Sequence, residues 1–147
     1  MNKNNEQVEL SYYQLTLQSF LEESHPELSN DSDLIVNRGN LASQAYSQAI
    51  IDGQTHSQAE ELANEVLFKN LHFSKHDTLV NVLWNEFADE VPQGSAKELA
   101  QKLLPLCEEV FAGYPLSDDF AFDPQFDQLY TELTGTIVRW FEEHELQ

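Results

Sequence analysis

The sequence predicts an all-α protein of six or seven helices. Apolar residues recur at steps of three and four along most of the 147 residues, the spacing that places them on one face of a helix. No stretch alternates convincingly at the period of two that a half-buried strand shows. A chain of this length can bury about 68–70% of its extended surface, enough for a core without metals or disulfides. We therefore expect a flexible N-terminus over residues 1–8 and a single helical domain over residues 9–147.

The first two helices are bounded by clear start and stop signals. One is expected over residues 9–24, because the residue before proline in His25-Pro26 disfavours helical backbone. The next runs from a group of capping residues at 30–33 to about Ile51. Its inward face includes Gly39 and Ala42, and side chains this small let a neighbouring helix approach closely.

A central helix is expected over about residues 75–91, after a third helix that opens at the capping pattern Ser57-Gln58-Ala59-Glu60. The central segment is apolar over most of its circumference, which is typical of a helix surrounded by other helices. Its apolar positions are Leu79, Val80, Val82, Leu83, Trp84, Phe87, Ala88 and Val91. This helix is the predicted centre of the fold.

The remaining helices follow breaks at proline and glycine. Ser95 opens one helix, which Pro105 is expected to kink or divide. The longest irregular stretch covers residues 114–122, and Asp123-Pro124 then caps the last helix. Gly135 lies inside that helix at a cost of about 1 kcal/mol relative to alanine, so a close backbone contact or a bend is expected there.

Four stretches of the chain resemble a small uncharacterised helical family of anaerobic bacteria: SYYQLTLQSFLEESHPEL, LHFSKHDTLVNVLWNEF, YPLSDDFAF and LYTELTGTI. The resemblance extends from near Leu10 to the C-terminus. That family has no established activity and no assigned catalytic residues, so it supplies no site. Its members often lie among the genes of conjugative transposons. The resemblance therefore implies a bacterial cytoplasmic setting and a link to mobile DNA.

The charge balance narrows the classes of partner. Asp and Glu number 26 against 7 Lys and Arg, a formal charge of −19, and no Lys or Arg occurs from Leu103 to Val138. Such a surface repels nucleic acid and anionic membranes, which bind proteins through basic side chains. The N-terminus lacks the features of a signal peptide, and one cysteine allows no internal disulfide. We expect a soluble cytoplasmic protein, for which a homo-oligomer stays open and solubility alone is the simplest use of the charge.

No catalytic, cofactor or metal site is expected. Glu22-x-x-His25 supplies only half of the repeated motif that a di-iron helical bundle needs, and His25 precedes a proline. His72 and His76 are separated by a helix cap, so they do not share a helical face. Cys107 has acidic neighbours, Glu108 and Glu109, which disfavour a reactive thiolate, so we interpret it as a small core residue.

The two arginines and two tryptophans are assigned structural roles. Arg38 and Arg139 are expected to balance nearby acidic groups, with Arg139 reaching Glu143 one turn further along its helix. Trp84 and Trp140 occur at helical spacing among other apolar residues, so both are expected in the core.

The loop over residues 114–122 is the candidate partner-binding site. It combines apolar side chains with carboxylates, the mixture found where a loop meets another protein, and it includes Tyr114, Leu116, Asp118, Asp119 and Phe120. The alternative is that its aromatic rings fold back onto the core and hold the last helix in place.

Three functional hypotheses remain open. The first is a non-enzymatic acidic binding or regulatory module that engages a basic protein partner, and its sharper form is DNA mimicry, in which rows of carboxylates occupy a DNA-binding groove. The second is an enzyme with an unrecognised helical active site, which a deep pocket with paired carboxylates or an Arg38 anchor would favour. The third is a structural subunit, which a large exposed apolar patch would favour.

Overall fold

The computed structural model describes residues 3–145, and it describes side chains over residues 12–144. Six α-helices and no strand occur in this part of the chain, so the all-α prediction is confirmed. The contacts between residues divide the chain into an N-terminal unit, residues 1–71, and a C-terminal unit, residues 72–147. Each unit has a hydrophobic core of its own. The expectation that residues 9–147 form a single domain stays a prediction.

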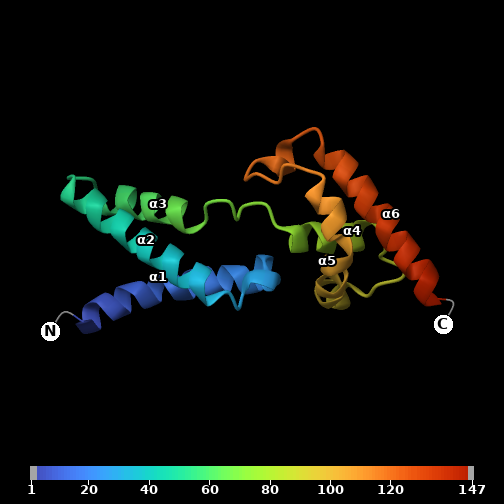
Figure 1. The fold of residues 1–147 in the computed structure, drawn as a ribbon, viewed down its shortest axis with the longest axis horizontal. Coiled ribbons are helices and arrows are strands. Elements are labelled where there is room, and N and C mark those ends of the chain that lie inside the picture. Colours follow the sequence, from blue (N-terminus) through green and yellow to red (C-terminus); the bar gives the residue numbers. More distant parts are fainter. Residues whose placement is uncertain (1–2, 146–147) are drawn as a thin grey trace. The chain divides into compact units, whose positions relative to one another are not determined.

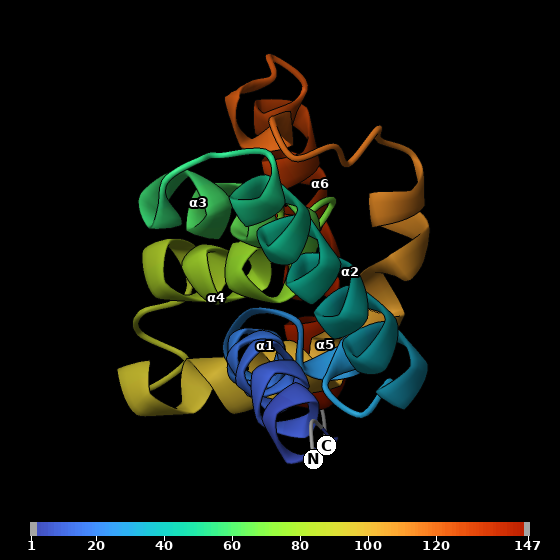
Figure 2. The same cartoon turned by 90° about the vertical axis from the view of Figure 1, so that its left-hand side faces the viewer.

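The N-terminal unit consists of α1 (Lys3–Ser24), α2 (Ser32–Ile51) and α3 (His56–Leu67), with α2 packed against both other helices (Figures 1 and 2). Helix α1 begins six residues before its expected start, and residues 1–2 of the expected flexible segment lie outside the described residues. Its end at Ser24 was predicted, and the buried His25 that follows holds the carbonyl of Leu71 through Nε2 at 2.7 Å.

Close packing of α1 on α2 depends on small residues, as the sequence predicted. A Cβ atom added at Gly39 would lie 2.9 Å from Cγ of Gln14, closer than real Cβ contacts come. Helix α3 opens earlier than expected, at Thr55, because Thr55 and Gln58 form the capping box that had been assigned to Ser57 and Glu60. Gly53 lies between α2 and α3 with a φ of +89°, a conformation that glycine adopts without strain.

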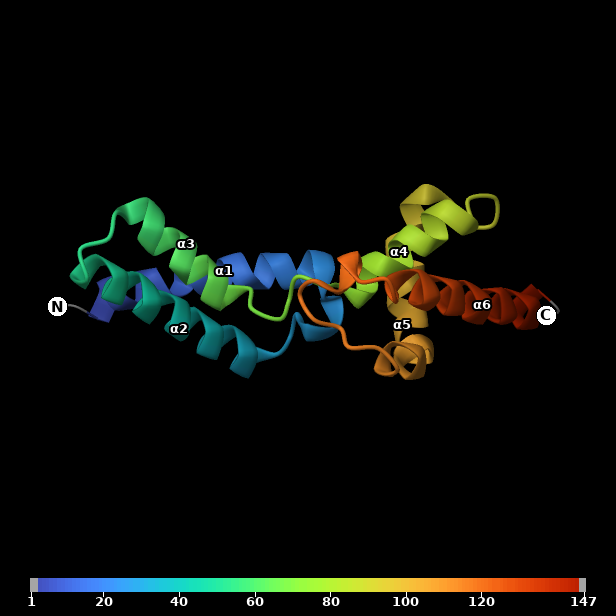
Figure 3. The same ribbon diagram turned by 90° about the horizontal axis from the view of Figure 1, so that it is seen from above.

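The C-terminal unit consists of α4 (Lys75–Glu86), α5 (Ala96–Ala112) and α6 (Phe126–Glu145), and each helix packs against the other two (Figure 3). The described part of the chain also contains three short 3₁₀ helices: Pro26–Leu28 in the first unit, and Gln93–Ser95 and Phe120–Phe122 in the second. Pro105 does not divide α5, because its side of the helix faces solvent and the missing backbone hydrogen bond can be replaced by water.

Helix α4 is shorter than the predicted central helix. It ends at Glu86 rather than at Val91, because Phe87 leaves the helical region and Pro92 disfavours helix at the preceding residue. The segment after α4 folds into turns closed by hydrogen bonds from Glu90 and Val91 to the carbonyl of Phe87. Phe87 and Val91 are buried even so, while Ala88 is exposed. The apolar pattern thus predicted burial correctly at both positions, although it placed them in the wrong secondary structure.

Two further expectations in this unit are wrong. Trp84 was expected in the core, but 38% of its surface is exposed and its Nε1 donates a hydrogen bond to the carbonyl of Gln93 at 3.2 Å. Gly135 was expected at a close contact or bend, but nothing lies within 4 Å of a Cβ built there, and α6 is continuous. No packing requirement in the structure accounts for this glycine.

Candidate protein-binding site

The segment between α5 and α6 is an ordered loop. Its backbone closes a series of tight turns, in which Phe120 donates to the carbonyl of Ser117 at 3.0 Å and Phe122 donates to that of Asp119 at 2.9 Å. The 3₁₀ helix Phe120–Phe122 stands at the middle of these turns. The loop backbone therefore has a defined conformation, and each side chain can be assigned to the core or to the surface.

Three of the five predicted site residues turn toward the core. Phe120 is 1% exposed, and its ring meets the edges or faces of Phe73 and Tyr114 at centroid distances of 5.4 and 5.8 Å. Tyr114 and Leu116 are half-buried against the same core. These contacts favour the alternative in which the loop folds back and holds α6 in place. Phe120 therefore has no accessible surface to offer a partner.

Tyr114 also ties the loop to α6 by a polar contact. Its hydroxyl donates to Oε1 of Glu132 at 2.8 Å. Desolvation, followed by this hydrogen bond and the negative charge of Glu132, raises the pKa of Tyr114 above its ordinary value. Tyr114 thus keeps its proton and its role as a donor well into the alkaline range.

The two predicted carboxylates have different environments. Asp118 is half-buried, and its Oδ1 accepts a hydrogen bond from the backbone N–H of His72 at 3.1 Å, while its Oδ2 lies 3.9 Å from Nε2 of the same residue. This carboxylate connects the loop to the segment that precedes α4. Asp119 is exposed. Of the two, Asp119 is the carboxylate that the loop presents to solvent.

Phe122 is the surface residue that the sequence-based list omitted. Its side chain is 88% exposed, although it lies only two residues from the buried Phe120. A 3₁₀ helix has three residues per turn, so positions two apart point in different directions and only one ring can enter the core. This rule identifies one exposed phenylalanine once the local helix is known. The sequence alone did not reveal the 3₁₀ helix.

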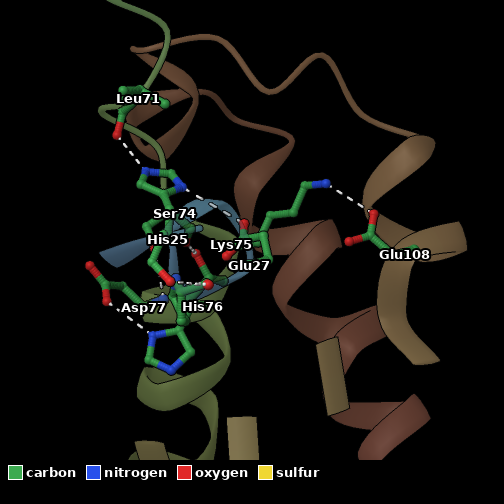
Figure 4. A network of polar contacts seen from close by, with 11 residues as sticks. His25, Glu27, Leu71, Ser74, Lys75, His76, Asp77 and Glu108 are labelled. Atoms are coloured by element: carbon green, nitrogen blue, oxygen red, sulfur yellow. Dashed lines mark hydrogen bonds and ion pairs between the residues drawn. The ribbon is translucent and has the colours of Figure 1, made fainter. Parts of the chain in front are cut away.

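The exposed Phe122 lies close in the chain to two carboxylates, Asp119 and Asp123. We call these three residues the Phe122 site. Asp123 is half-buried, and its Oδ1 accepts from the backbone N–H of Gln125 at 2.8 Å, so its position is fixed as well. No basic residue lies within 103–138 to neutralise these charges. Lys75 lies at the edge of this stretch, where its Nζ is 3.0 Å from Oε2 of Glu108 (Figure 4).

Other candidates have structural roles. Cys107 lies fully buried in the C-terminal core, where burial and then the charge of Glu108 raise its pKa from 9.0 to about 11, so it is a protonated core thiol at neutral pH. Arg38 donates to the carbonyls of Val66 and Leu67 at 3.3 and 3.1 Å, which caps the end of α3 and corrects the expectation that it balances acidic groups.

His72 and His76, which are four residues apart, differ in their exposure to solvent. His76 is 2% exposed, and its Nε2 donates to the carbonyl of Lys97 at 3.1 Å, whereas His72 is exposed (Figure 4 shows His76). Among the described side chains, no group of three or more His, Cys, Asp or Glu residues is arranged to hold a metal ion. Likewise, none of the helices within residues 3–145 has the length and apolar character needed to cross a bilayer.

The comparisons with known proteins agree with this fold. Residues 5–146 match the family model described as Domain of unknown function (DUF1896). The chain belongs to this family. Protein PG0816 from Porphyromonas gingivalis, whose crystal structure is known, is 44% identical in sequence with a TM-score of 0.90, over 99% of each chain. No curated protein matches the chain. The resemblance to an uncharacterised helical family is confirmed, and the connection of DUF1896 with conjugative transposons stays a prediction.

Proposed function

We propose that the protein is an acidic binding module that engages a basic protein partner through the Phe122 site. The observation that carries this proposal is the 88% exposure of Phe122 on a loop fixed by its own hydrogen bonds. An exposed phenylalanine loses apolar contact with water when a partner covers it, which makes such rings frequent energetic centres of interfaces. Because the loop is already ordered, little conformational entropy is lost on binding.

Charge determines the class of partner. Asp119 and Asp123 flank the ring, and the surrounding 36-residue stretch from Leu103 to Val138 contains no Lys or Arg. A surface with Lys or Arg around an apolar pocket would complement both parts of the site. Such attraction accelerates association and weakens as salt shortens the Debye length from about 10 Å at 0.1 M to about 3 Å at 1 M. We place this encounter in the bacterial cytoplasm, the setting that the family resemblance implies.

The test captures the partner at one position and then measures its kinetics. Phe122 is replaced by a photo-crosslinking phenylalanine derivative in the native host, and Tyr12, a 55% exposed aromatic residue of the other unit, is replaced in the same way as the control. We expect a Lys- and Arg-rich protein to be crosslinked from position 122 and not from position 12. A partner without basic character, or equal capture from both positions, would contradict the proposal.

Binding kinetics with the purified partner then separate the contribution of the Phe122 ring from that of the negative charge. Phe122→Ala should accelerate dissociation at least about tenfold if the ring is a buried anchor, while Asp119→Lys should slow association and reduce its salt dependence. Asp52→Lys, an exposed change of equal charge in the other unit, is the control for general electrostatics. Binding that is insensitive to salt and to Phe122→Ala would overturn the site.

DNA mimicry is the sharper form of the proposal. It requires the partner to bind duplex DNA with the same surface that meets the Phe122 site. Unlabelled duplex should then displace the protein from its partner in a competition titration at two salt concentrations. A ternary complex of partner, DNA and protein would exclude mimicry and leave the binding module intact.

A further inference from the structure

A small hollow lies between α5 and α6, apart from the Phe122 site. Its volume is ≈ 260 Å³. Pockets for drug-sized ligands usually measure roughly 300–1,000 Å³, so this hollow suits a smaller molecule. Leu103, Leu106 and Cys107 line it from α5, and Thr136, Arg139, Trp140 and Glu143 line it from α6.

Two opposite charges line this hollow without pairing. Arg139 and Glu143 are one turn apart on α6, yet no ion pair within 4.0 Å and no hydrogen bond joins them. The order with the basic residue first is the less favourable one for a pair four residues apart on a helix. Neither side chain has another hydrogen-bonding or ionic partner among the described residues. Both are therefore available to a ligand, in contrast to Lys75 and Arg38, which are already engaged.

The rest of the lining consists of apolar side chains and one hydroxyl group. Leu103 and Cys107 belong to the buried core, while Leu106 is 57% exposed. The Trp140 ring is half-buried and stacks on His144 with centroids 4.0 Å apart, which restricts its rotation. The Thr136 hydroxyl donates to the carbonyl of Glu132 at 3.0 Å, so its oxygen can only accept from a ligand.

These features select a ligand by charge. A net charge of −19 repels an anion at long range, and a simple cation would meet the Arg139 guanidinium inside the hollow. A zwitterion is neutral at a distance and carries both complementary groups. We propose that the hollow binds a free α-amino acid with an apolar side chain. Its carboxylate pairs with Arg139, its ammonium group pairs with Glu143 and can donate to the Thr136 oxygen, and its side chain covers Leu106 and Trp140.

The test uses three ligands that differ by one charged group: leucine, 4-methylpentanoate without the amine, and isopentylamine without the carboxylate. Binding is followed by amide chemical shifts of the isotope-labelled protein. We expect leucine to bind at least about tenfold more tightly than either analogue, because each loses one charge-assisted contact. Arg139→Gln and Glu143→Gln should each weaken leucine binding at least about tenfold. Both positions are exposed, so the variants should keep the helical circular dichroism of the parent.

Matched controls decide the outcome. Lys102→Gln removes a cation from a neighbouring hollow that also includes Trp140, and Glu142→Gln removes an exposed carboxylate outside both hollows. Neither should change leucine binding. Absence of leucine binding, equal binding of 4-methylpentanoate, or equal losses in the control variants would overturn the proposal. Phe122→Ala should leave leucine binding unchanged, so this inference and the proposed partner binding succeed or fail separately.

Discussion

The two units build their cores from different side chains. The N-terminal core contains no buried phenylalanine and brings α1 and α2 together through small residues such as Gly39 and Ala42. The C-terminal core contains four buried phenylalanines, Phe73, Phe87, Phe111 and Phe120. Three of these four lie outside the α-helices. Small residues allow regular helices to approach, whereas large rings let turns and loops contribute to a core.

The largest expected effect tests whether these cores are separate in energy as well as in composition. Leu83 in the C-terminal core and Leu17 in the N-terminal core are both fully buried. Replacing either by alanine should lower the free energy of unfolding by about 2–5 kcal/mol. Both tryptophans lie in the C-terminal unit, so their fluorescence reports that unit, while far-ultraviolet circular dichroism reports all helices.

The prediction of a single domain requires the two probes to give one common transition, and each of Leu17→Ala and Leu83→Ala must shift both probes by the same amount. Urea unfolding followed by both probes provides the measurement. A fluorescence midpoint that falls for Leu83→Ala and stays unchanged for Leu17→Ala would show that the units unfold independently. A loss below about 0.5 kcal/mol at Leu83 would instead show that α4 is peripheral to its own core.

The difference between the cores also explains what the sequence could predict. Helical periodicity predicted α2 with its end at Ile51, and it identified Gly39 as a point of close approach. It placed Phe87 and Val91 in a helix, whereas both side chains enter the core from turns beyond α4. Periodicity assumes a constant angle between successive residues, and a turn changes that angle.

The same limit of periodicity applies to the candidate site, where the sequence selected a loop but did not show which of its rings are buried. The sequence selected the loop over residues 114–122 as the candidate site, because a cluster of aromatic and acidic residues between helices is unusual. It could not separate the buried Phe120 from the exposed Phe122, since that distinction depends on a 3₁₀ helix held by three-dimensional contacts. The unpaired Arg139 and Glu143 were also missed, because their spacing alone predicts an ion pair.

The next largest expected effect is a loss of stability at alkaline pH, caused by a buried thiol in the C-terminal core. The pKa of Cys107 is raised from 9.0 to about 11, so the folded state holds this proton more tightly than the unfolded chain does. The resulting stabilisation is fully present below about pH 9 and is lost as the pH rises to about 11. Cys107→Ala should cost about 1 kcal/mol at pH 8, and the difference from the parent should shrink at pH 11.

Ionisation of two tyrosines also lowers stability at alkaline pH, so the effect of Cys107 must be measured as the difference between the parent and Cys107→Ala. Desolvation raises the pKa of Tyr130, as it does that of Tyr114, so both also destabilise the fold as they ionise. Their contribution is common to the parent and to Cys107→Ala and cancels in the difference. A difference that is constant from pH 8 to 11, measured by urea unfolding, would show that the thiol is solvated.

A smaller effect tests the close approach in the N-terminal unit. Gly39→Ala places a Cβ 2.9 Å from Cγ of Gln14, so the Gln14 side chain or one of the two helices must shift. Overpacking costs about 1–3 kcal/mol, and the better helix propensity of alanine returns about 1 kcal/mol. We expect a net loss of up to about 2 kcal/mol in thermal or urea unfolding. Restoring space with Gln14→Ala in the same chain should recover most of that loss, and failure to recover it would mean that the contact at Gln14 is not the cause.

The smallest expected effect is a gain in stability from Gly135→Ala in the C-terminal unit, in contrast to the loss expected from Gly39→Ala. Gly135 has an exposed position inside α6, its φ is negative, and nothing lies within 4 Å of a Cβ built there. Gly135→Ala therefore meets no steric cost, and the smaller loss of backbone entropy should raise stability by about 1 kcal/mol. Thr134 and Thr136 on either side donate hydroxyl hydrogen bonds to the carbonyls four residues earlier, so both flanking hydroxyls are already engaged within the helix. Measured beside Gly39→Ala under identical conditions, a gain at 135 and a loss at 39 would establish that the two units use glycine differently. A loss at 135 would contradict the open surface that the structure shows around this position.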